Sequence, residues 1–134
     1  MTGRVVVDAS AFVAVLTDNG ADGVWASEQI AGRYLSAPEL MPFETSNILR
    51  RLAARSAITS DLATLSHSSL QECHIDLWPY SLLAERCWQL RNNLTVYDAS
   101  YVTLAEILKV PLVTLDHRIA SAPGIRCTVL TPRV

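Results

Sequence analysis

Short apolar runs alternate with helix-like patterns along this chain of 134 residues. The first run, residues 5–7, is β-branched and ends at Asp8, which predicts a strand buried on both faces. Four further short runs predict strands at residues 34–36, 75–78, 112–115 and 126–130. Strands that alternate with one or two helices predict an α/β fold with a central, mostly parallel sheet.

Apolar residues spaced three or four apart predict the intervening helices, at residues 11–16, 21–31, 38–54, 61–71, 81–92 and 98–109. Pro38 is expected to start the third of these, because proline is tolerated in a first helical turn. Val24 and Leu82 are expected to face inward, and Tyr97 or Asp98 to begin the last long helix.

Four acids stand beside these apolar patterns. Asp8 and Asp116 each end a predicted strand, and ligands of parallel sheets bind outside the carboxyl ends of the strands. Glu44 borders the apolar face of its helix, and Asp98 shares a helix face with inward-facing residues. Each of the four acids therefore comes from a separate element.

Each acid also has a simpler reading when it is taken alone. Asp8 or Asp98 can cap a helix, and Asp116 can begin an Asx-turn. Glu44 can pair with Arg51. Taken together, these readings require four unrelated placements of charge beside apolar runs.

Four carboxylates at one edge of a sheet would repel one another unless a cation lay between them. Mg²⁺ and Mn²⁺ prefer oxygen ligands of this kind, and no Cys or His belongs to these patterns, which disfavours zinc. A Mg²⁺ or Mn²⁺ ion held by carboxylates is typical of enzymes that act on phosphate esters. The sequence therefore predicts a metal site formed by Asp8, Glu44, Asp98 and Asp116.

The formal net charge of −2 argues against binding nucleic acid through bulk charge, although the chain is slightly basic once the four acids are set aside. Its basic residues are all arginine except Lys109. Arginine suits phosphate contacts, but a GC-rich genome would produce the same bias. Three cysteines without a zinc spacing, and a beginning without a signal-peptide pattern, predict free thiols and a cytoplasmic protein with no membrane segment.

The motifs VVVDASAFVAVL, ELMPFETSNILRRL and LTVYDASYVTLAEILKVPLVTLDHR resemble, in order and spacing, those of PIN domains. The likeness is to the VapC-type ribonuclease toxins of type II toxin–antitoxin systems, and it spans nearly the whole chain. It implies a single PIN-like domain over residues 1–134, folded as a three-layer α/β/α sandwich. It also implies a Mg²⁺- or Mn²⁺-dependent endoribonuclease, a VapB-type antitoxin as partner, and assembly into a homodimer and a toxin–antitoxin hetero-oligomer.

Residue by residue, the four catalytic and metal-binding acids of the family fall on Asp8, Glu44, Asp98 and Asp116. The small hydroxyl residues near its metal fall on Ser10 and Thr114, and the polar helix residue after the glutamate falls on Asn47. These three residues are expected to hydrogen-bond the acids or metal-bound water, without binding the metal themselves. Two arginines are candidate contacts to RNA phosphates, Arg51 and Arg118.

Two other functions remain open at this point. A Mg²⁺-dependent phosphatase or phospho-receiver domain also has acids at strand ends. A receiver, however, needs a lysine at a strand end, and a phosphatase of the aspartyl type needs a second Asp where Ser10 stands. The other alternative is a metal-binding or protein-interaction module without turnover.

Overall fold

Five strands form one sheet in the computed structural model, which describes residues 3–133. The strands lie in the order β3-β2-β1-β4-β5, and every neighbouring pair is parallel. Their bounds are Arg4–Val7 (β1), Tyr34–Pro38 (β2), Ile75–Trp78 (β3), Leu112–Val113 (β4) and Val129–Leu130 (β5). Within the described residues the predicted sheet is therefore entirely parallel.

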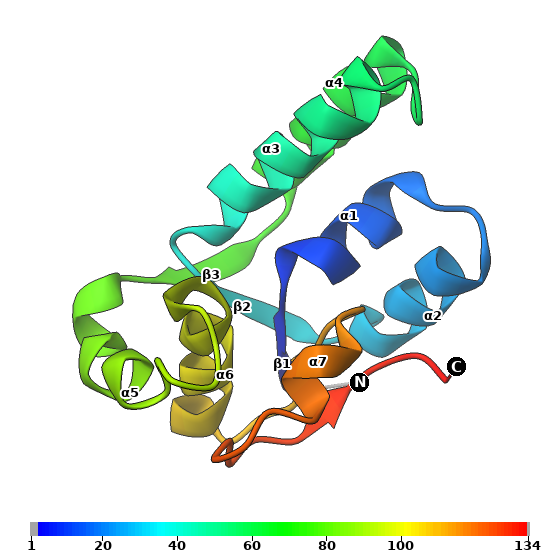
Figure 1. Ribbon diagram of the computed structural model, residues 1–134. Coiled ribbons are helices and arrows are strands. Elements are labelled where there is room, and N and C mark those ends of the chain that lie inside the picture. Colours follow the sequence, from blue (N-terminus) through cyan, green and yellow to red (C-terminus); the bar gives the residue numbers. More distant parts are fainter. Residues whose placement is uncertain (1–2, 134) are drawn as a thin grey trace.

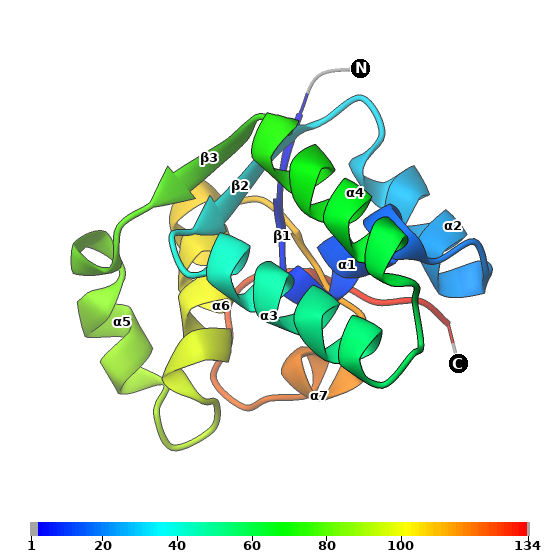
Figure 2. The ribbon, with the colours of Figure 1, turned by 90° about the horizontal axis from the view of Figure 1, so that it is seen from above.

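Helices cover both faces of the sheet, as Figure 1 shows. Helices α1 to α4 pack on one another, whereas α6 lies against β1, β2 and β4 with α5 beside it. Viewed from above, α3 and α4 run side by side across the molecule (Figure 2). The predicted three-layer α/β/α sandwich is confirmed. The helices are Ala9–Thr17 (α1), Ala21–Ile30 (α2), Met41–Ala54 (α3), Ser60–Glu72 (α4), Ala84–Gln89 (α5), Val96–Leu108 (α6) and His117–Ala120 (α7), with a 3-10 turn, η1, at Tyr80–Leu82.

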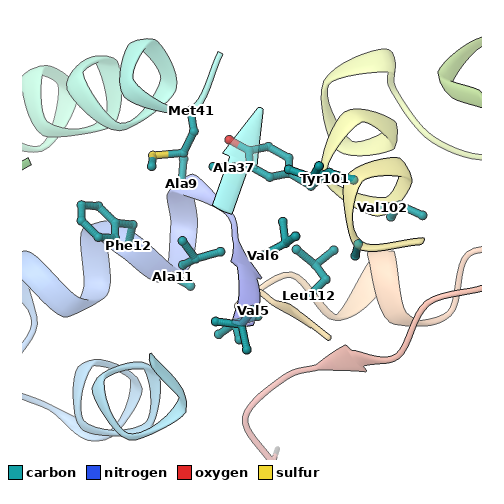
Figure 3. Close-up of a cluster of buried hydrophobic side chains, with 14 of the residues drawn as sticks. Val5, Val6, Ala9, Ala11, Phe12, Ala37, Met41, Tyr101, Val102 and Leu112 are labelled. Carbon is teal, nitrogen blue, oxygen red and sulfur yellow. The ribbon is translucent and has the colours of Figure 1, made fainter. Parts of the chain in front are cut away.

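The core lies between the sheet and its two helical layers. Val5, Val6 and Val7 of β1 are fully buried, as expected for a central strand covered on both faces. Phe12 of α1 packs on one side of this strand and Val102 of α6 on the other (Figure 3).

The chain reverses its direction of travel across the sheet at β1. It runs outward from β1 to β2 and β3, then returns to the other side of β1 to form β4 and β5. The carboxyl ends of β1 and β4 therefore flank a topological switch point, which is where open parallel sheets bind ligands. Register pairs Val7 with Val113, so the next residues, Asp8 and Thr114, emerge side by side.

Some expected elements were wrong in their bounds or orientation. Pro38 does not start α3: it is the last residue of β2, where it pairs with Trp78, and the helix begins at Met41. The segment 81–92, predicted as one helix, instead forms part of the 3-10 turn η1 and the separate helix α5. Leu82 lies in η1 and is exposed. The last two strands of the chain, β4 and β5, are also shorter than predicted, with two residues each.

Helix α2 faces the core with its smallest residues, contrary to the expectation for Val24. Gly23 and Ala26 are buried, and Val24 is half exposed. The reason is a close approach between backbones, because a Cβ atom on Gly23 would lie 1.7 Å from the carbonyl oxygen of Asp18. Two chain segments this close leave no room for a valine between them.

Thr95, not Tyr97 or Asp98, caps α6. Its hydroxyl accepts a hydrogen bond from the backbone N–H of Asp98 at 3.1 Å. We expect Thr95→Ala to lower the free energy of unfolding by about 1 kcal/mol, because that N–H then loses its partner in the folded state. Thr95→Ser keeps the hydroxyl and should stay near the wild-type value in urea unfolding. Equal losses in both variants would contradict a capping role.

The cysteines are free thiols, as predicted. Among residues 3–133, none of the helices has the length and apolar character needed to cross a membrane.

Candidate active site

Asp8 stands at the centre of the candidate site, directly after β1. Its carboxylate is almost fully buried, with 6% of the residue exposed. It caps α1 by accepting a hydrogen bond from the backbone N–H of Ala11 at 3.0 Å. Asp8 is therefore a helix cap as well as a candidate site residue, and Ser10 lies inside the helix.

Two hydroxyl groups hold the Asp8 carboxylate in place. Ser10 Oγ donates to Asp8 Oδ1 at 2.7 Å, and Thr114 Oγ1 donates to Oδ2. The same hydroxyls accept from the backbone that follows β4: Ser10 from the N–H of Leu115 and Thr114 from that of Asp116. These contacts join the carboxyl ends of β1 and β4 through side chains.

Glu44 enters from the first turn of α3 and meets a tyrosine of α6. The hydroxyl of Tyr101 donates to Glu44 Oε1 at 2.5 Å, across 57 residues of sequence. Burial raises the pKa of Glu44, the Tyr101 hydrogen bond opposes this rise, and the charges of Asp98 and Asp8 add to it. The sequence-based pairing of Glu44 with Arg51 is replaced by this contact.

Asp98 lies in the first turn of α6, partly exposed. Burial raises its pKa, and the charge of Asp116 raises it further. The pKa of Asp8 is likewise raised, first by burial and in part by the charge of Asp98, against the hydrogen bonds that it accepts. The four acids therefore share one electrostatic neighbourhood, although they come from four separate elements.

Asp116 differs from the other three acids because an arginine holds it. Arg118 donates to its carboxylate through Nε at 3.0 Å and through a terminal nitrogen at 2.7 Å. This contact is the main reason that the pKa of Asp116 is lowered. Asp116 also caps α7 by accepting from the backbone N–H of Arg118, as an Asx-turn residue does.

The chemistry of this donor set fits a hard divalent cation. All of its ligand atoms are oxygens, and three of the carboxylates have raised pKa values, a cost that an adjacent cation would reverse. In residues 3–133, however, no three acid, histidine or cysteine side chains converge closely enough to enclose an ion as they stand. The carboxylates of Asp8, Glu44 and Asp116 instead accept hydrogen bonds from Ser10, Thr114, Tyr101 and Arg118.

The remaining predicted residues lie further from the acids. Asn47 is exposed on α3 and accepts a hydrogen bond from Arg50 Nε at 2.9 Å. Arg51 is exposed and lines a hollow of about 510 Å³ whose wall also includes Ser10 and Leu115. Arg51 therefore borders the site, whereas Asn47 points its amide oxygen along the helix surface.

Sequence reasoning missed the role of the Tyr101 hydroxyl. With only 2% of the residue exposed, Tyr101 is part of the core. Its spacing of three residues after Asp98 places both on one face of α6, which was the available signal. That Glu44 would meet this face depends on how α3 packs, and no local pattern reports that.

Comparison with known proteins agrees with this fold. The PIN domain family matches residues 5–125. A curated protein of Mycobacterium tuberculosis, "Ribonuclease VapC1", is 38% identical over 92% of this chain and 94% of its own length.

Two solved structures have a similar fold at low sequence identity. VapC20 of Mycobacterium tuberculosis, described as a Sarcin-Ricin loop cleaving toxin, superposes with a TM-score of 0.69 at 14% identity, covering 96% of this chain and 99% of that one. A chain of VapBC2 from Rickettsia felis, bound to a DNA fragment from its promoter, superposes at 0.60 with 11% identity, over 96% and 98%. These two structures agree in fold, and the family match together with the identity to VapC1 establishes that the chain belongs to the PIN domain family and, within it, to the VapC proteins.

Proposed function

We propose that this protein is a Mg²⁺- or Mn²⁺-dependent endoribonuclease that acts as the toxin of a toxin–antitoxin pair. The observation that carries the proposal is that four acids from separate elements lie near the switch point of the sheet, where burial and the charges of neighbouring acids raise the pKa values of three of them. The ribonuclease names of its VapC relatives support the choice of RNA as substrate.

In this proposal Asp8, Glu44, Asp98 and Asp116 would hold the ion. When bound, Mg²⁺ or Mn²⁺ would neutralise these carboxylates, polarise a phosphate oxygen and make water more acidic. Ser10 and Thr114 keep both oxygens of Asp8 in fixed positions, so the Asp8 carboxylate itself would need little reorientation when the ion binds. This mechanism needs no histidine as a base; His117, the residue after Asp116, acts on that acid only through its charge.

Two side chains have roles toward water and RNA. The free oxygen of Glu44 can accept a proton from water or orient it, since Tyr101 holds only Oε1. Arg118 is exposed. If metal binding released Arg118 from Asp116, the Arg118 guanidinium would be available to an RNA phosphate. In the overall reaction the water oxygen bonds to phosphorus, one P–O ester bond breaks, and the leaving alcohol takes a proton.

A metal requirement is directly testable with purified protein and a structured RNA. We expect cleavage with Mg²⁺ or Mn²⁺, loss of at least about 100-fold in EDTA, and recovery when either metal is restored. Attack by water predicts products without 2′,3′-cyclic phosphate ends, which end-labelling can check. Cleavage that persists in EDTA, or cyclic ends, would contradict the mechanism. Mn²⁺ binding without any cleavage would favour the non-catalytic module.

The phosphatase and receiver alternatives gain no support from the fold. Lys109, the lysine that a receiver would use, is the C-cap of α6, at the opposite end of that helix from Asp98. Ser10, in place of a second aspartate, binds the Asp8 carboxylate.

We also propose a VapB-type antitoxin as partner, supported by the VapBC2 structure whose fold this chain shares. Arginines of such a partner would fit the carboxylate cluster, as Arg118 fits Asp116. A homodimer and a toxin–antitoxin hetero-oligomer remain proposals that rest on the family resemblance.

A further inference from the structure

Tyr101 lies against parts of the molecule that carry three of the four acids. It lies on α6 three residues after Asp98, and its hydroxyl donates to Glu44 of α3. The phenol oxygen also lies near the backbone of Ala9, the residue after Asp8. Figure 3 shows the ring reaching from α6 toward Ala9 and Met41, with its oxygen leading.

From these contacts we infer that Tyr101 is a positioning residue, whose hydroxyl holds the Glu44 carboxylate in the orientation that metal binding and catalysis require. The inference rests on the proposed function and adds a residue that is not among the predicted metal ligands or their three supporting residues. Tyr101 reaches neither RNA nor solvent, since only 2% of it is exposed, so it acts through Glu44.

Core packing alone does not explain a tyrosine at this position. The ring would fill the same space as phenylalanine, and a buried phenol without a partner would destabilise the fold. A hydroxyl bonded to a carboxylate is, by contrast, a charge-assisted hydrogen bond. The side chain that gains most from it is Glu44, which is partly exposed and would otherwise sample several rotamers.

The position of this hydrogen bond matters for the geometry of the site. Glu44 is the only one of the four acids on α3, and α3 packs chiefly on the neighbouring helices α1 and α4. The Tyr101 hydroxyl spans from α6 to α3 at the level of the acids. Without it, the distance between Glu44 and Asp98 would depend on packing between helices alone.

Tyr101→Phe tests the inference, because it removes the hydroxyl and keeps the ring. Loss of one hydrogen bond costs about 1 kcal/mol, so the variant should remain folded. We expect kcat for RNA cleavage and the Mn²⁺ affinity of the RNA-free protein each to fall about 10-fold or more, with KM for RNA within about twofold of wild type. Mn²⁺ binding is followed by electron paramagnetic resonance of the free ion.

Two further variants separate positioning from packing. Thr103→Val removes another buried hydroxyl of α6, one that contacts Cys87 away from the acids, and should change neither kcat nor Mn²⁺ affinity. In a Glu44→Gln background, Tyr101→Phe should add less than about a twofold loss, because both changes then act on one carboxylate.

The inference is overturned if Tyr101→Phe stays within about twofold of wild type in both measurements, or if its full loss recurs in the Glu44→Gln background. A wild-type protein that binds Mn²⁺ but cleaves no RNA would refute the proposed function alone. The Mn²⁺ affinities of the four proteins in the cycle would then still decide the role of Tyr101.

Discussion

Asp8→Asn is expected to abolish RNA cleavage and at the same time to stabilise the metal-free protein. A metal ion in such a site contributes several kcal/mol to transition-state stabilisation. Because each tenfold in rate corresponds to about 1.36 kcal/mol, we expect a loss of about 10³-fold in kcat/KM. Asparagine retains a side-chain oxygen for the backbone N–H of Ala11, so the cap of α1 is kept.

The expected gain in stability follows from the direction of the Asp8 pKa shift. Burial raises that pKa, so the ionised carboxylate is less favourable in the folded chain than in the unfolded one. Its unfavourable contribution is absent below the ordinary pKa and appears as pH rises through the raised pKa. At neutral pH, removing the charge should add about 1–2 kcal/mol to the free energy of unfolding, or roughly 3–8 °C in Tm.

Thermal unfolding in EDTA at pH 7 and pH 4 checks this expectation. The gain of Asp8→Asn over wild type should shrink at the lower pH, where wild-type Asp8 is closer to neutral. Asp8→Ala serves as the control, because it also removes the charge but loses the cap and should gain less or be destabilised. A metal-free Asp8→Asn protein that is less stable than wild type would contradict the account of the site.

Arg86→Met is expected to destabilise the fold without altering the chemistry. Arg86 donates to Glu106 through Nε at 2.8 Å and through a terminal nitrogen at 3.2 Å, and also to the carbonyl of Gly124 at 2.7 Å. Both partners are largely buried, at 19% and 11% side-chain exposure. Removing one partner of a buried pair leaves an uncompensated charge, so we expect a loss of about 3 kcal/mol in the free energy of unfolding.

Urea unfolding measures this loss, with Arg91→Met as the matched control. Arg91 is exposed, donates to the carbonyl of Trp88 and lies over the Trp88 ring at 4.5 Å, so its replacement should cost no more than about 1 kcal/mol. Glu106 lies near the end of α6 that is remote from Asp98, so cleavage by folded Arg86→Met protein should remain within about twofold of wild type. Equal losses in the two variants would show that the buried pair contributes nothing.

Local patterns predicted the parts of the site that local structure creates. The β-branched run 5–7 became β1, and the acid after it became the cap of α1, because both depend on neighbouring residues alone. Thr59 likewise caps α4 through a local contact to the N–H of Leu62. Membership of the PIN domain family was predicted from motif order and is confirmed by the family match.

Local patterns failed where packing between elements decides the outcome. Pro38 suits a helix start, but β2 extends through it because Trp78 of β3 offers a partner strand. Val24 was assigned to the core by its hydrophobicity, yet α2 approaches α1 too closely there for any residue but Gly23. The local sequence of β2 does not predict that β3 will be its partner strand, and the local sequence of α2 does not predict how closely α1 approaches it.

The sequence by itself determined the α/β class of this protein, and the placement of Asp8 and Asp116 after strands, since periodicity and strand ends are local properties. Only the tertiary structure decided which donors meet each acid. Thr114 reaches Asp8 because β1 and β4 are neighbours in the sheet, although 106 residues separate them. Tyr101 reaches Glu44 because α3 and α6 converge at one edge. Such contacts depend on the order of strands and the packing of helices, which arise only when the whole chain folds.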